Sequence, residues 1–148
     1  MNQNRKLIRN IGVVVPSPAD PFFAEIARSV EQRCIDAGYR PTLYSAHGKR
    51  ELEVEILDSL RSPKPAGLLI APLRRISNKA AIEDFNKSVP TVLFDSYLQD
   101  IRLAFCGSDN SQFGRLSVDY LCRTEPPLDC RRLIYLSYAA MSDFSRVA

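Results

Sequence analysis

Two short apolar runs, each closed by a proline, most strongly constrain the fold of this chain. The first covers residues 11–15 before Pro16, and the second covers residues 67–71 before Pro72. Apolar runs of this length, bounded by turn residues, are typical of strands that are buried on both faces. Such strands belong to parallel sheets with helices on either side. The two runs therefore predict a covered parallel sheet.

Helical patterns lie between the predicted strands. After the first strand, Asp20 is placed as an N-cap, Pro21 as the first helical residue and Gly38 just beyond the helix end. Residues 50–60 also fit a helix, although Leu52, Val54 and Ile56 alternate as in a strand. Because strands and helices alternate through short connections, we predict an α/β fold with a doubly wound parallel sheet. The remaining predicted elements are strands at 42–45, 91–94, 103–106 and 133–136, and helices at 78–87 and 111–123.

The composition excludes several classes of protein. A chain of 148 residues is about one domain's worth, and its net charge of +3 is spread in small clusters that do not favour nucleic-acid binding. No apolar stretch approaches the roughly 20 residues of a membrane helix, and no signal peptide is visible. The four cysteines have no CxxC spacing, so ordinary thiols are favoured over a metal site. Free thiols fit a reducing compartment, which predicts a cytoplasmic location.

No catalytic constellation is visible in the sequence. The single histidine, His47, has no assigned serine or cysteine nucleophile in its loop, and neither a GxGxxG nor a P-loop motif is present. The sequence therefore predicts a protein that is not an enzyme and that holds no cofactor.

Candidate ligand-binding residues follow the predicted strands, where parallel sheets bind their ligands. Carboxylates accept hydrogen bonds from hydroxyls, arginines hold anionic groups, and aromatic rings pack on the apolar face of a sugar. Each candidate also has a purely structural alternative, as a helix cap, a core side chain or a solvated surface arginine. The candidates are Asp20, Phe22 and Phe23 after the first strand, Arg74 after the third, Asp95 and Ser96 after the fourth, and Asp109 after the fifth.

Several motifs, in order, resemble the effector-binding core of the lac repressor family, which the periplasmic sugar-binding proteins share. The resemblance implies a hinged, two-lobed clamp that closes on a sugar-like small molecule. It places ligand contacts on Asp20, where the ribose-type pattern has asparagine, on Phe22 and Phe23, and on Asp95. The family often has arginine where this chain has Ser96, and Arg74 is a candidate to replace that donor. The motifs are Ile11-Gly-Val-Val-Val-Pro16, Asp20-Pro-Phe-Phe23, Gly38-Tyr39, Gly67-Leu-Leu-Ile-Ala-Pro72, Val89-Pro90, Phe94-Asp95 and Ser108-Asp109-Asn110.

The resemblance also implies an organisation for the chain. Residues 1–10 are expected to be a polar linker or tail, 11–107 the N-terminal lobe, and 108–148 a hinge crossing with the start of an incomplete second lobe. An incomplete lobe favours a homodimer. We expect the effector-sensing domain of a transcriptional regulator, with DNA contacted only through a helix-turn-helix that this chain lacks. The alternative is the sugar-binding component of an uptake system.

Overall fold

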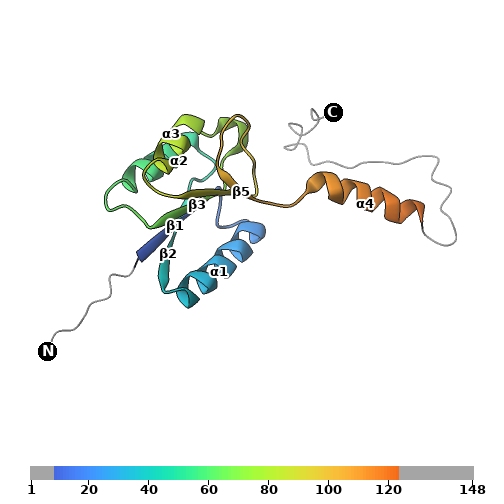
Figure 1. Cartoon of the computed structure of the whole chain (residues 1–148), viewed down its shortest axis with the longest axis horizontal. Helices are drawn as coiled ribbons and strands as arrows, with labels where there is room; N and C mark the ends of the chain where they lie inside the picture. Colours follow the sequence, from blue (N-terminus) through green and yellow to red (C-terminus); the bar gives the residue numbers. More distant parts are fainter. Residues whose placement is uncertain (1–8, 124–148) are drawn as a thin grey trace. The chain divides into compact units, whose positions relative to one another are not determined.

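The computed structural model describes residues 9–123, and it divides the chain into two units between Ser108 and Asp109. The first unit contains a five-stranded sheet with three α-helices, and the described part of the second contains one helix (Figure 1). Within the described residues, no helix combines the length and the apolar character needed to cross a membrane.

All five strands of the sheet run parallel. β1 (Arg9–Val15) pairs with β2 (Tyr39–Ser45) on one side and with β3 (Gly67–Ile70) on the other. β3 pairs with β4 (Thr91–Phe94), and β4 pairs with β5 (Ala104–Cys106), giving the order β2-β1-β3-β4-β5. From β1 the chain adds β2 on one side, and it then adds β3, β4 and β5 on the other side. Right-handed crossovers in these two opposite directions place helices on both faces of the sheet. The predicted fold class is confirmed.

The helices form two outer layers. α1 (Pro21–Asp36) lies on one side of the sheet, and α2 (Arg50–Ser59) and α3 (Lys79–Asn86) lie together on the other (Figure 1). A short 3-10 turn, η1 (Arg74–Ile76), precedes α3. The helical interpretation of residues 50–60 is confirmed and the strand alternative is wrong, because Glu53 and Leu57 are buried one helical turn apart.

The core has one apolar cluster on each face of the sheet. The cluster beneath α2 and α3 includes Leu57, Ile82 and Phe85, all completely buried against the central strands. The smaller cluster beneath α1 consists of Val13, Val15, Phe23, Ala71 and Phe94.

Local signals set the limits of α1. The Asp20 carboxylate accepts a hydrogen bond from the Phe22 backbone N–H at 2.9 Å, which makes Asp20 the predicted N-cap. Gly38, two residues beyond the helix, adopts a positive φ of 78°, a conformation that glycine tolerates at no steric cost. β2 begins three residues earlier than predicted and includes Pro41. An edge strand has one neighbour, so it accommodates a residue that lacks a backbone N–H.

The second unit is described through α4 (Asn110–Cys122), which begins one residue before its predicted start. The Asp109 carboxylate accepts a hydrogen bond from the Gln112 N–H at 2.8 Å and caps this helix. The strand predicted at residues 133–136 lies outside the described residues.

Phe85→Ala is expected to lower the free energy of unfolding by about 3–5 kcal/mol, because it removes a completely buried ring and leaves a cavity. Urea unfolding followed by circular dichroism measures the change. Ile35→Ala is the control, since the Ile35 side chain is exposed and its truncation should cost little. Equal losses in the two variants would contradict this assignment of the core.

Candidate functional site

The topology brings three of the predicted ligand-binding loops to one edge of the sheet. β1, β3 and β4 are neighbours in the sheet, and the carboxyl ends of parallel neighbours meet at the same edge. We call this edge, with the loops that follow these strands, the carboxyl edge. It includes Asp20, Phe22 and Phe23 after β1, Arg74 after β3, and Asp95 and Ser96 after β4.

Two adjacent aromatic rings have different environments at the start of α1. Phe22 is 53% exposed, whereas Phe23 is buried. Their rings meet edge to face with centroids 5.2 Å apart, and Phe23 also contacts the ring of Phe94 at 6.5 Å. Phe23 is therefore a core side chain, which is the structural alternative that the sequence left open. Phe22 offers an accessible apolar surface of the kind that packs against a sugar ring.

Asp95 is held in a tight turn directly after β4. Its φ is +63°, and the Ser96 N–H donates to the Phe94 carbonyl oxygen at 2.7 Å, closing a three-residue turn around it. The hydroxyl of the buried Ser96 donates to the Asp95 carboxylate at 2.9 Å. A carboxylate has about four acceptor sites, so this bond orients the group and leaves capacity for ligand hydroxyls.

Left-handed backbone recurs in the loops of the first unit. Besides Asp95, the non-glycine residues His47 (φ 48°) after β2, Arg74 (φ 57°) after β3 and Asp100 (φ 66°) between β4 and β5 have positive φ values. A side chain with a Cβ rarely adopts this conformation, and functional sites are a common place for it. Asp95 and Arg74 lie at the carboxyl edge, whereas His47 and Asp100 lie outside its candidate residues.

Asp109 belongs to the second unit and is described separately from the other candidates. Its carboxylate caps α4, which is the structural alternative that the sequence analysis gave for this residue. Glu53, by contrast, was not a predicted site residue. It is completely buried, and it reaches the loop after β3. The sequence signal was a glutamate on the apolar face of a helix, beside Ile56, Leu57 and Leu60.

The described residues contain no group of three or more His, Cys, Asp or Glu side chains placed to hold a metal ion. Three cysteines, Cys34, Cys106 and Cys122, are free thiols. Within this part of the chain, the carboxyl edge therefore offers carboxylates, hydroxyls, a guanidinium and an exposed ring. These groups suit the reversible binding of a polyhydroxylated molecule.

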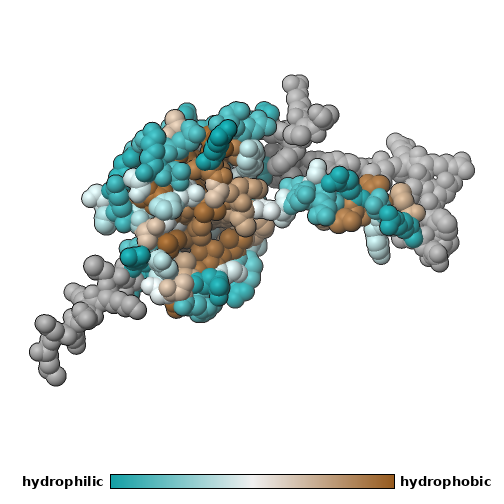
Figure 2. Space-filling view, viewed as in Figure 1, coloured by the Kyte–Doolittle hydropathy of each residue, from teal (hydrophilic) through white to brown (hydrophobic). Residues whose placement is uncertain are grey.

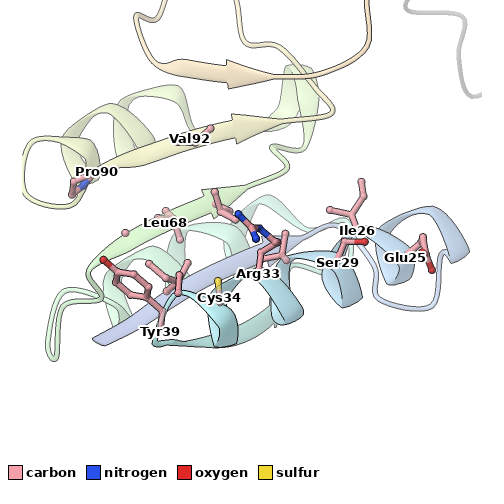
Figure 3. Close-up of a pocket in the computed structure, with 14 residues that line it drawn as sticks. Glu25, Ile26, Ser29, Arg33, Cys34, Tyr39, Leu68, Pro90 and Val92 are labelled. Atoms are coloured by element: carbon pink, nitrogen blue, oxygen red, sulfur yellow. The ribbon is translucent and has the colours of Figure 1, made fainter. Parts of the chain in front are cut away.

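An apolar groove lies elsewhere, between α1 and the amino-terminal parts of the strands (Figure 3). It has a volume of about 740 Å³ and is lined by side chains such as Ile26, Val30 and Leu69. Figure 2 shows apolar residues gathered over the strands of the first unit. A largely apolar groove leaves sugar hydroxyls without partners, so its chemistry does not suit a sugar ligand.

The comparisons with known proteins define the class. Residues 11–126 match the model of the periplasmic binding protein domain family. The chain belongs to this family.

Individual relatives include both regulators and binding proteins. The chain is 28% identical over 120 residues to the HTH-type transcriptional repressor CytR of Escherichia coli K12, a match that covers 81% of this chain and 35% of the repressor. It is 31% identical to a periplasmic binding protein/LacI transcriptional regulator of Alkaliphilus metalliredigens, solved with D-xylulofuranose, with a TM-score of 0.61 over 76% of this chain and 40% of the other. The Caulobacter myo-inositol binding protein shares the fold, with a TM-score of 0.71 at 19% identity over 80% of this chain and 41% of the other. This chain thus spans about a third of the length of the curated repressor.

Asp95→Val is expected to lower the free energy of unfolding by about 2–4 kcal/mol, because a β-branched residue is strained at positive φ and the buried Ser96 hydroxyl loses its acceptor. Asp95→Asn tolerates the same backbone and keeps an acceptor oxygen, so it should cost less than about 1 kcal/mol. Chemical denaturation of both variants measures the difference. Two equally stable variants would argue against the left-handed turn.

Burial raises the pKa of the Cys34 thiol, which lines the apolar groove. The thiolate is the reactive form, so Cys34 should be alkylated by iodoacetamide at pH 8 more slowly than the exposed Cys106 and Cys122. Mass spectrometry of the digested protein gives the rate at each site. The differences should disappear in urea, and an equal rate at all three thiols in the folded protein would contradict the burial of Cys34.

Proposed function

We propose that this chain is the effector-sensing part of a lac-repressor-type transcriptional regulator, and that it binds a sugar or a related small molecule without transforming it. The observation that carries the proposal is the match to a named transcriptional repressor across 81% of this chain. The solved relative that binds D-xylulofuranose supports a sugar-like effector.

In this proposal, the carboxyl edge forms one side of the ligand site. Asp95, oriented by Ser96, and Asp20 accept hydrogen bonds from ligand hydroxyls, while Phe22 packs against an apolar face of the ligand. Phe23 supports Phe22 from the core, and Arg74 donates to ligand oxygens. Asp109, on the second unit, remains a predicted ligand contact.

The proposal extends to the organisation of the protein. The N-terminal lobe extends to residue 107 and includes all of β1, so Arg9 and Asn10 belong to the lobe and the predicted linker 1–10 is shorter by these two residues. Residues 108–148 form a hinge crossing and the start of a second lobe. The regulator contacts DNA through a helix-turn-helix, as its similarity to an HTH-type repressor supports. It acts in the cytoplasm as a homodimer, needs no cofactor, and has no membrane partner.

A sugar-binding component of an uptake system is the second candidate. The fold shared with a myo-inositol binding protein favours it. Disulfide mapping of the protein from its native compartment separates the two candidates, since an oxidising periplasm predicts paired cysteines and the cytoplasm predicts free thiols.

A thermal-shift screen of this chain against pentoses, hexoses, their phosphates and their acids tests the proposal. A ligand that binds only the folded state stabilises it by RT ln(1 + [L]/Kd), about 2.7 kcal/mol at a hundred times Kd. We expect at least one sugar class to raise the melting temperature, and we expect Asp95→Ala to abolish that shift.

Asp36→Ala is the matched control, because Asp36 is an exposed aspartate at the far end of α1 from Asp20. It should melt with the same ligand-induced shift as the parent chain. A chain that unfolds cooperatively and responds to none of the compounds would contradict sugar binding by this chain, and a shift that survives Asp95→Ala would remove Asp95 from the site.

A further inference from the structure

A buried carboxylate lies directly behind the candidate ligand site. Glu53 stands in the first half of α2, and its side chain has no exposed surface. Removing a charged carboxylate from water is costly unless hydrogen bonds replace its hydration. The bonds that Glu53 makes therefore indicate what this residue does in the fold.

Those bonds all come from the segment between β3 and α3, 20 or more residues further along the chain. The Leu73 N–H donates to Glu53 Oε2 at 3.2 Å, and the Ser77 hydroxyl donates to the same oxygen at 2.9 Å. The Asn78 N–H donates to Glu53 Oε1 at 3.3 Å. One carboxylate thus binds both ends of the segment 73–78.

The two ends are also bonded to each other. The Leu73 N–H lies 2.6 Å from Ser77 Oγ, so the serine hydroxyl accepts from one end of the segment while it donates to Glu53. Beyond this point, Asn78 is the N-cap of α3, with its side-chain oxygen accepting from the Ala81 N–H at 3.2 Å. Glu53 therefore fixes both the loop and the start of the next helix.

Arg74 lies between the two fixed ends, in the left-handed conformation with φ 57°. The 3-10 turn that it begins is closed by a hydrogen bond from the Ser77 N–H to the Arg74 carbonyl oxygen at 3.2 Å. An arginine gains nothing intrinsic from positive φ, and such a backbone persists where surrounding contacts over-determine it. The contacts made by Glu53 are of this kind.

We propose that Glu53 is a positioning residue of the carboxyl edge: its buried carboxylate holds both ends of the segment 73–78 and so keeps Arg74 left-handed beside the ligand site. The binding of a ligand by Arg74 rests on the proposed sugar-binding function. The placement itself is a property of the folded chain, and it can be measured with no ligand present.

Hydrogen exchange in the isotopically labelled full chain tests the contacts directly. In Glu53→Gln, an NH2 group replaces one carboxylate oxygen. This group donates hydrogen bonds and cannot accept one from the N–H or hydroxyl that donated to that oxygen. We expect exchange at the Leu73 amide, the Asn78 amide or both to accelerate by about tenfold or more, because the two N–H groups donate to different carboxylate oxygens and glutamine keeps only one acceptor oxygen. Glu55→Gln makes the same change at an exposed site on the same helix and should leave both rates unchanged.

A double-mutant cycle with Arg74→Gly tests the effect on the arginine backbone. Glycine relieves the strain of positive φ, but it also increases the entropy of the unfolded chain. The second effect is the same whether or not Glu53 is present, so it cancels in the cycle. We expect the change in melting temperature caused by Arg74→Gly to be more favourable, by about 3 °C or more, with Glu53 than in the Glu53→Gln background.

Ser77→Ala provides a second cycle if Glu53→Gln does not fold, since it removes the bridging hydroxyl and leaves the carboxylate in place. It should reduce the benefit of Arg74→Gly in the same direction. Equal shifts from Arg74→Gly in every background, or unchanged exchange at Leu73 and Asn78, would overturn the proposal. A negative sugar screen changes neither the exchange rates nor the melting temperatures. Failure of the proposed sugar binding can therefore be distinguished from failure of the proposed role of Glu53.

Discussion

The need to cover both faces of a parallel sheet governs this structure. Its central strands, β1, β3 and β4, carry apolar side chains on both faces, and Val14, Val15 and Ile70 have no exposed surface. Burial of such strands is favourable at about 25 cal/mol per Å² of apolar surface, which requires helices on either side. Parallel neighbours need long crossovers, so the helices and the shared carboxyl edge follow from the same requirement. The candidate site is thus a product of how the core is closed.

Core and candidate site are continuous at Phe23. Its ring contacts Phe94 within the core beneath α1, and it contacts the exposed Phe22 ring edge to face. Asp95 follows Phe94 directly, so a carboxylate and an aromatic surface are both supported by one buried pair of rings. Supporting side chains of this kind hold binding groups in fixed positions and lower the entropy that binding would otherwise cost.

Much of this arrangement follows from local signals in the sequence. The proline-closed apolar runs located β1 and β3, and the Asp20, Pro21 and Gly38 pattern located α1, because strand burial and helix capping act over a few residues. The left-handed Arg74 was not predictable in this way. Glycine and asparagine are the usual sequence signs of positive φ, and arginine is not one of them. Its conformation depends on a glutamate from a different helix, so only tertiary structure reveals it.

The two outer strands of the described sheet affect how the chain behaves among its own copies. An unpaired strand edge offers backbone N–H and C=O groups to another chain, which is a route to fibrous aggregation. Here β2 carries Pro41, which has no N–H to donate, and β5 is three residues long. Both edges are poor templates for adding a strand. Self-association through the described sheet would therefore use side-chain surfaces, which select a specific partner geometry, in place of open-ended backbone ladders.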